Sequence, residues 1–166
     1  MATITFKGQP VQTLGELPQP GTSAPDFLLT TGDLQDVTLA TYGDTKKVLN
    51  IVPSLDTGIC AASARKFDKE IAKRENVVCL TISMDLPFAS TRFCKTEGVA
   101  NIVTLSQLRD RSFGKDYQCE MVDGPMAGLL SRGVVVLDET NTVLYTEQVP
   151  EIAQEPDYKT ALSYLD

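Results

Sequence analysis

The chain has 166 residues, 42% of them hydrophobic, and a formal net charge of -7 at pH 7. A chain of this size can bury one full core, so we expect a single domain over residues 1–166. The acidic balance argues against a nucleic-acid partner, because such binding depends on Lys and Arg contacts to phosphate. No apolar run approaches the roughly 20 residues of a spanning helix, and the first residues lack the apolar stretch of a signal peptide. We therefore expect no membrane association and a cytoplasmic location.

The N-terminal quarter contains short strand patterns separated by turn residues. Alternating segments over residues 3–6 and 11–14 flank Gly8 and Pro10, which predicts an N-terminal β-hairpin. A loop rich in Pro and Gly follows over residues 18–25. Two further short strands are expected, over residues 27–30 and 37–39.

A buried strand and an amphipathic helix are predicted next. Residues 47–52 (KVLNIV) form a short apolar run that ends at Pro53, as expected for a central strand. Mostly apolar residues then recur at helical spacing, at Cys60, Ala64, Phe67 and Ile71. Charged residues occupy the other faces of this segment, so the pattern predicts a helix that begins near Cys60.

The second half of the chain continues the alternation of strands and helices. Residues 77–84 predict a second buried strand, and Pro87 suits the first turn of a helix that carries Cys94 near its end at Gly98. The remaining expected elements are a strand over residues 102–105, an irregular stretch to Pro125, a hairpin over 133–137 and 143–149, and a helix over 157–165. This order predicts an α/β fold with a central mixed β-sheet that helices cover on both faces. That description includes the thioredoxin-like fold.

The junction between the first buried strand and its helix carries the most specific chemistry. Cys60 is expected in the first helical turn, where unpaired backbone N–H groups favour a thiolate. The thiolate, rather than the thiol, is the form that attacks a peroxide oxygen. Thr57 can turn its hydroxyl toward the sulfur or toward a peroxide oxygen, and Pro53 can cover the site and limit the access of water.

The spacing Pro53-x-x-x-Thr57-x-x-Cys60 resembles the active-site signature of the peroxiredoxins, and the wider segment VPSLDTGICAAS is similar to their bacterial thiol peroxidase branch. Further matching segments lie along the whole chain, at Lys7-Gly8, Pro25 to Phe27, Ser83 to Cys94, and Glu155 to Tyr158. The resemblance implies that Cys60 is the peroxidatic cysteine and Cys94 the resolving cysteine. It also implies that the Arg132 guanidinium completes the pocket with Thr57 and Pro53.

An arginine suits this role on physical grounds. Its guanidinium stays charged under all relevant conditions and donates hydrogen bonds in a fixed fork, so it can stabilise a thiolate and polarise the O–O bond. Because the chain contains no histidine, a permanent cation is the group that remains for this task.

The resemblance implies an antioxidant reaction on a hydroperoxide substrate. Cys60 would become a sulfenic acid, Cys94 of the same chain would condense with it to a disulfide, and thioredoxin would restore both thiols. A disulfide needs Cα atoms within about 7 Å, yet the two cysteines lie on different predicted helices, so we expect helix ends to unwind locally during turnover. A homodimer packed near the active-site face is also implied, with no cofactor and no metal.

Each candidate residue also has a purely structural interpretation. Without the motif, Cys60 and Cys94 would be small buried residues on amphipathic helices, and Arg132 would be a surface cation. Cys79 lies inside VVCLTIS and is assigned to the core, where burial suppresses thiol reactivity. Cys119 lies in a polar stretch where it could be exposed and oxidised, but nothing around it suggests activation, so we expect a bystander.

An apolar group later in the chain has two interpretations. Packing in the core or at its edge is favoured, and a lining for bulky organic hydroperoxides is the alternative that stays open. The residues concerned are Met121, Met126, Leu129 and Leu130.

Several other classes of cysteine protein fit less well. A cysteine hydrolase needs a base, normally histidine, which the chain lacks. A thioredoxin-type oxidoreductase carries Cys-x-x-Cys, but the third residue after Cys60 is Ser63. Arg65 is one residue too early for the Cys-x5-Arg loop of cysteine phosphatases, and the cysteines are too far apart in sequence for a structural zinc site. The remaining alternative is a peroxide sensor or redox-switched binding module that uses Cys60 and Cys94 without turnover.

Overall fold

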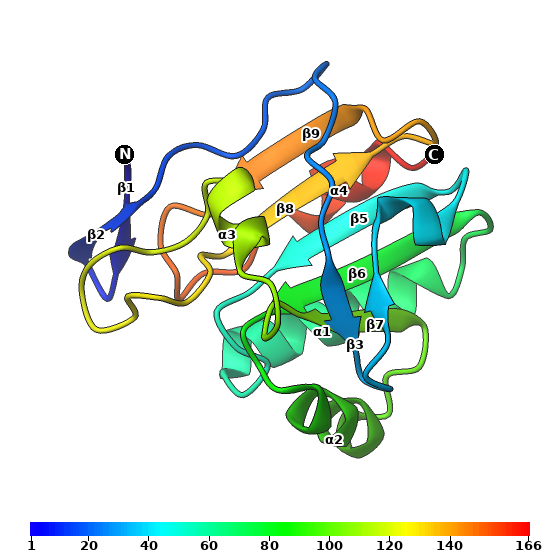
Figure 1. The fold of residues 1–166 in the computed structure, drawn as a ribbon, viewed down its shortest axis with the longest axis horizontal. Helices are drawn as coiled ribbons and strands as arrows, with labels where there is room; N and C mark the ends of the chain where they lie inside the picture. Colours follow the sequence, from blue (N-terminus) through cyan, green and yellow to red (C-terminus); the bar gives the residue numbers. More distant parts are fainter.

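The structure, a computed structural model, describes residues 1–166 and contains a seven-stranded mixed β-sheet of order β4-β3-β7-β6-β5-β8-β9 (Figure 1). The strands are β3 (Leu29–Thr31), β4 (Asp36–Val37), β5 (Lys46–Ile51), β6 (Val77–Ser83), β7 (Ile102–Ser106), β8 (Gly133–Leu137) and β9 (Val143–Gln148). The central strands β5, β6 and β7 are parallel, whereas β8 is antiparallel to β5. The expected α/β architecture around a mixed sheet is therefore confirmed.

Two crossovers place the long helices on one side of this sheet. The helix α1 (Gly58–Ile71) connects β5 to β6, and α2 (Pro87–Glu97) connects β6 to β7. Such crossovers are right-handed, and both proceed in the same direction across the sheet, so both helices cover the same face. The helix α4 (Tyr158–Ser163) packs beside β8 on that face. Figure 1 shows α1 and α4 behind the sheet and α2 below it.

The sheet divides the core into two layers. Side chains alternate along each strand, so Val48 and Cys79 point to one side whereas Leu49 and Leu80 point to the other. We call the side covered by α1, α2 and α4 the helix face, and the opposite side the apolar face. The apolar face is closed by segments before β5, including the 3-10 helix η1 (Leu39–Tyr42), and by the short helix α3 (Ser112–Asp116).

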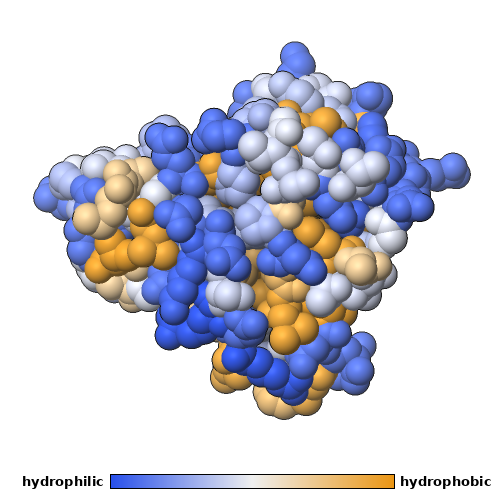
Figure 2. Space-filling model, turned by 45° about the horizontal axis from the view of Figure 1, so that its top comes forward, coloured by the Kyte–Doolittle hydropathy of each residue, from blue (hydrophilic) through white to orange (hydrophobic).

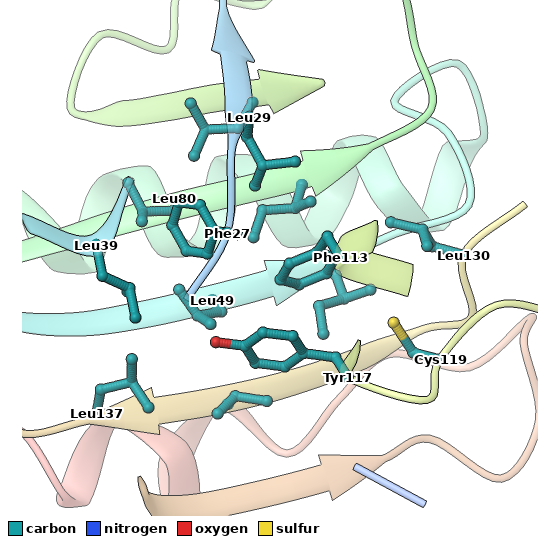
Figure 3. Close-up of a cluster of buried hydrophobic side chains, with 14 of the residues drawn as sticks. Phe27, Leu29, Leu39, Leu49, Leu80, Phe113, Tyr117, Cys119, Leu130 and Leu137 are labelled. Carbon is teal, nitrogen blue, oxygen red and sulfur yellow. The ribbon is translucent and has the colours of Figure 1, made fainter. Parts of the chain in front are cut away.

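Aromatic packing holds these covering segments on the apolar face. The Phe113 ring stacks on Tyr117 with centroids 4.3 Å apart and meets Phe27 edge-on at 6.0 Å. Figure 3 shows these rings gathered with Leu49 and Leu80 of the sheet. The buried Tyr117 hydroxyl donates a hydrogen bond to the Pro25 carbonyl at 2.7 Å. This layer therefore buries its aromatic residues without leaving the phenol group unpaired.

The N-terminal segment forms the expected β-hairpin. Strands β1 (Ala2–Phe6) and β2 (Gln9–Thr13) are antiparallel and make a separate two-stranded sheet at one end of the molecule (Figure 1). The hairpin pairs with the segment after β9, because the Thr5 N–H donates to the Pro150 carbonyl at 2.8 Å and the Ile152 N–H donates to the Thr5 carbonyl at 2.9 Å. The first residues of the chain thus lie beside residues near its end.

The structure differs from the sequence-based expectations at three places. The stretch expected to be irregular contains α3, which at five residues is too short to show a helical period and forms around the buried Phe113. The strand expected over residues 37–39 ends at Val37, and η1 follows. The prediction that Cys119 could be exposed was wrong, because its side chain is fully buried and burial raises the pKa of its thiol.

None of the helices is both long and apolar enough to cross a membrane.

Candidate active site

The strand-to-helix junction places Cys60 as the sequence predicts. Strand β5 ends at Ile51, and Thr57 has the extended backbone of a helix N-cap before α1 begins at Gly58. Cys60 therefore lies in the first turn of α1, where N–H groups lack partners within the helix and their dipoles favour negative charge. The Cys60 side chain has no exposed surface.

The pairing of β5 with β8 brings the predicted arginine to this junction. Ile51 at the end of β5 faces Gly133 at the start of β8, so Arg132 arrives beside the residues that lead into α1. Its Nη1 donates to the Cys60 Sγ at 3.1 Å, and its Nε donates to the Ile152 carbonyl at 2.6 Å. Arg132 is only 2% exposed. A buried guanidinium needs strongly polar or anionic partners, and the Cys60 sulfur and the Ile152 carbonyl lie against this one.

The loop between β5 and α1 is held by a carboxylate that the sequence analysis did not single out. Asp85 accepts hydrogen bonds from the Ser54 hydroxyl at 2.7 Å, the Leu55 N–H at 2.7 Å and the Ser83 hydroxyl at 2.8 Å. Because Asp85 also lies just before α2, it fastens the segment leading to Cys60 onto the segment leading to the Cys94 helix. Asp85 lies within the segment Ser83 to Cys94, whose resemblance to the thiol peroxidase branch was the sequence signal that could have identified it. Its hydrogen-bond partners become apparent only in the folded chain.

Thr57 and Pro53 both lie at the site, but the Thr57 hydroxyl donates its hydrogen bond within the loop and not to the Cys60 sulfur. The Thr57 Oγ1 donates to the Ser54 carbonyl at 3.1 Å, which braces the loop. Both residues line a cavity of about 160 Å3 next to Cys60, together with Arg132. The remaining residues that line this cavity are Phe6, Gly58, Ile59, Met126, Ile152 and Ala153. The fold thus brings four distant parts of the chain around one space.

The structure divides the methionine group between the core and the cavity. Met121 and Leu130 are fully buried in the core, as packing residues are. Met126 is partly exposed and lines the cavity, whereas Leu129 packs against the small cluster formed by Ile4, Val11, Met121 and Ile152. Phe6, Ile152 and Ala153 were missed by sequence reasoning, because their contribution depends on the hairpin pairing with the segment after β9.

The second predicted cysteine lies apart from this cavity. Cys94 is half-buried in α2 and packs against the core layer that contains Cys60. Burial raises the pKa of the Cys94 thiol, an effect that a hydrogen bond with Thr104 partly offsets. All four cysteines are free thiols in this structure. Cys60 and Cys94 therefore share one layer of the core without a bond between them.

Ionic and polar contacts join the two cysteine-bearing helices. Arg65 of α1 forms an ion pair with Glu97 of α2 at 2.8 Å. The Asp68 carboxylate of α1 accepts hydrogen bonds from the backbone N–H groups of Ala100, Asn101 and Ile102, in the segment that follows α2. These contacts are largely exposed, and exposed ion pairs contribute little to stability. They set the relative position of the helices without locking it.

The other thiols lack activating neighbours. Burial raises the pKa of Cys79 to about 12, which keeps it protonated and unreactive at neutral pH. Cys79 belongs to the core, as expected. No group of three or more Cys, Asp or Glu side chains is placed to hold a metal ion.

Comparison with known proteins agrees with this geometry. The model of the Redoxin family matches residues 19–162. A thiol peroxidase from Mycobacterium bovis is 50% identical over 165 residues, which cover 99% of either chain.

Solved structures show the same fold. A peroxiredoxin-like protein from Aquifex aeolicus superposes with a TM-score of 0.92 at 36% identity, covering 98% of this chain and 95% of that one. A thiol peroxidase from Chromobacterium violaceum superposes with a TM-score of 0.91 at 23% identity, covering 98% and 94%. Family model, sequence and fold agree, and the chain belongs to the Redoxin family, within its thiol peroxidase branch of the peroxiredoxins.

Proposed function

We propose that this protein reduces hydrogen peroxide and organic hydroperoxides with Cys60 as the nucleophile, Cys94 as the resolving thiol and thioredoxin as the reductant. The observation that carries the proposal is the 3.1 Å contact of the Arg132 guanidinium with the Cys60 sulfur, beside a cavity open to small molecules. A permanent buried cation on a thiolate in the first turn of a helix is an arrangement suited to attack on an O–O bond.

In the first step the Cys60 thiolate attacks the terminal oxygen of the hydroperoxide. An S–O bond forms and the O–O bond breaks, so the sulfur loses two electrons and becomes a sulfenic acid. The leaving alkoxide or hydroxide takes a proton and departs as alcohol or water. Arg132 can hold the reacting oxygens with the donor that now faces the sulfur, and Thr57 and Pro53 restrict the approach to the cavity.

In the second step the Cys94 sulfur attacks the sulfenic sulfur, a disulfide forms and water leaves. This step needs motion, because Cys60 is fully buried in α1 whereas Cys94 lies in a different helix. We expect the first turn of α1 and the end of α2 to open, and the exposed contacts between Arg65 and Glu97 are weak enough to break. Thioredoxin then reduces the disulfide to two thiols by exchange.

A homodimer is part of the proposal. Figure 2 shows apolar surface over the end of the molecule where α2 lies. Two large apolar side chains at the start of α2 are among the most exposed, Leu86 at 56% and Phe88 at 70%. They adjoin Asp85, which braces the active-site loop, so an interface there would lie near the active-site face. Sedimentation of the wild type and of Phe88→Asp tests this, since a wild-type monomer would exclude the dimer.

The direct test is to treat the fully reduced protein with one equivalent of an organic hydroperoxide and to map cysteine peptides by mass spectrometry without reduction. A peptide linking Cys60 to Cys94 supports the two-cysteine mechanism. A lone oxygen on Cys60 would remove Cys94 from the mechanism, and an unmodified Cys60 would overturn the peroxidase function.

Turnover distinguishes an enzyme from the alternative peroxide sensor. Sustained consumption of hydroperoxide with catalytic thioredoxin is expected for an enzyme, whereas a sensor would stop after one oxidation. We further propose that residues 1–166 act as one domain and that the protein works in the cytoplasm. Limited proteolysis and cell fractionation address these two points.

A further inference from the structure

The turn of the N-terminal hairpin encloses a carboxylate from the other end of the chain. Lys7 and Gly8 form the two-residue turn, and both have positive φ angles, 50° and 78°. Consecutive N–H groups in such a turn converge on one point and create a small anion-binding concavity. The Glu151 carboxylate fills it, with Oε1 accepting from the Lys7 N–H at 2.9 Å and Oε2 from the Gly8 N–H at 3.2 Å.

The same carboxylate makes two more hydrogen bonds. Its Oε2 accepts from the Thr5 hydroxyl, and its Oε1 accepts from the Ala153 N–H at 3.1 Å. These bonds, the one from Thr5 above all, lower the pKa of Glu151 to about 2, so the carboxylate is charged at any physiological pH. Oε1 therefore accepts from Lys7 and Ala153, and Oε2 accepts from Gly8 and Thr5.

The residues fixed in this way are walls of the cavity beside Cys60. Phe6 lies between Thr5 and the turn, with the Lys7 Nζ 5.3 Å from its ring centroid, while Ala153 and its neighbour Ile152 follow Glu151 directly. Phe6, Ile152 and Ala153 all line the cavity. Glu151 touches none of the reacting atoms, yet it joins the two segments that provide this apolar wall.

The position of Arg132 does not depend on the Glu151 side chain. Arg132 is fixed through backbone groups, because its Nε donates to the Ile152 carbonyl and its own carbonyl accepts from the Val149 N–H at 3.0 Å. The Ile152 N–H is in turn bound to the Thr5 carbonyl. Loss of the Glu151 carboxylate would therefore loosen the turn and Phe6 before it disturbed the contact with Cys60.

We propose that Glu151 is a positioning residue that sets substrate specificity, by fastening the hairpin so that Phe6 completes an apolar seat for the organic group of a bulky hydroperoxide. The inference rests on the proposed peroxidase function and adds the residue that governs substrate choice. A cavity of about 150 Å3 can admit a benzene ring, so the space beside Cys60 is of the size that an aryl group needs. Hydrogen peroxide has no such group and needs only Cys60 and Arg132.

The test compares cumene hydroperoxide with hydrogen peroxide in the wild type, Glu151→Gln and Thr5→Val. Glutamine offers a single acceptor oxygen, so it must leave the Gly8 N–H or the Lys7 N–H without a partner. We expect kcat/KM for cumene hydroperoxide to fall about fivefold in Glu151→Gln, the net effect of one ordinary hydrogen bond, and less in Thr5→Val. We expect kcat/KM for hydrogen peroxide to stay within about twofold.

A matched control carries the same kind of contact far from the cavity. Asp138 caps the turn between β8 and β9 by accepting from the Thr140 N–H at 2.8 Å and the Thr142 N–H at 2.9 Å. That turn follows the end of β8 opposite to Arg132. Asp138→Asn should therefore keep the wild-type ratio of the two rate constants.

Two further measurements separate this role from a general structural one. Iodoacetamide should alkylate Cys60 at the wild-type rate in Glu151→Gln, while amide hydrogen exchange should speed up at Phe6, Lys7 and Gly8. An unchanged ratio of the two peroxides, or an equal loss for both with slower alkylation, would overturn the proposal. Failure of the wild type to reduce either peroxide would instead overturn the function on which it rests.

Discussion

The two faces of the central sheet are built differently, although the same strands supply both. On the apolar face the Tyr117 hydroxyl is buried with a partner, the Pro25 carbonyl. On the helix face a row of polar side chains crosses the sheet, since Asn50 faces Thr81 and Thr81 faces Thr104 in register. Asn50 Oδ1 and Thr81 Oγ1 are buried there without a hydrogen-bond partner.

This polar row runs from beneath Cys60 to beneath Cys94. Asn50 Nδ2 donates weakly to the Ser63 hydroxyl at 3.4 Å, and that hydroxyl donates to the Cys60 carbonyl at 3.0 Å. At the other end Thr104 interacts with the Cys94 thiol. Unpaired buried polar groups lower stability. Within the sheet, the polar side chains left without partners therefore lie on the helix face, beneath the helices that open in the proposed mechanism.

The largest contrast is expected between cysteines of the two faces. Cys60→Ser should lower the rate of hydroperoxide reduction by a factor on the order of 10³ or more, because it removes the nucleophile. Cys119→Ser, the same change on the apolar face, should cost some stability but retain turnover. Hydroperoxide consumption with thioredoxin measures both, and loss of activity in Cys119→Ser at a temperature where it is folded would break the comparison.

The next contrast concerns stability. Phe113→Ala on the apolar face should lower the free energy of unfolding by about 3–5 kcal/mol, because it opens a cavity between Phe27 and Tyr117. Phe93→Ala in α2 should cost less, since Phe93 is 8% exposed whereas Phe113 is 1% exposed. Urea unfolding followed by circular dichroism gives both values. Equal losses would mean that the helix face is as rigid as the apolar face.

Two buried cations at opposite ends of β5 and β8 give a third contrast. Arg132→Met should slow the oxidation of Cys60 on the order of 10²-fold, because it removes a charged donor aimed at the reacting sulfur. Lys47 is also fully buried, but its Nζ donates to the Gly43 and Thr45 carbonyls at 3.0 and 2.9 Å, far from Cys60. Lys47→Met should change stability only. Stopped-flow kinetics of both variants distinguishes these roles.

The smallest expected effect tests the polar row itself. Thr81→Val replaces a buried hydroxyl that has no hydrogen-bond partner by a methyl group of similar shape. The free energy of unfolding should rise by about 1 kcal/mol. Closure of the disulfide after oxidation should slow, while the oxidation of Cys60 should not change. A loss of stability would show instead that an internal water satisfies the hydroxyl.

Local patterns in the sequence predicted most of the fold. The run KVLNIV and the spacing from Cys60 to Ile71 identified β5 and α1 to within two residues. The order of apolar and polar residues within such a segment indicates both its burial and its helical period. The same patterns failed for α3 and for Cys119. The residues around Cys119 are polar, so the local pattern does not indicate burial. The segment is buried because Phe113 and Tyr117 pack into the core cluster that also contains Cys119.

The sequence by itself determined most of the elements, the candidate nucleophile and the family, because the Pro-Thr-Cys spacing and the first helical turn are properties of adjacent residues. Only the tertiary structure decided what surrounds the sulfur. Arg132 reaches Cys60 through the pairing of β5 with β8. The hairpin turn next to Phe6 binds the carboxylate of Glu151, which comes more than half the chain later and directly precedes Ile152. Contacts between such distant residues depend on sheet register and side-chain packing, and no local pattern encodes either.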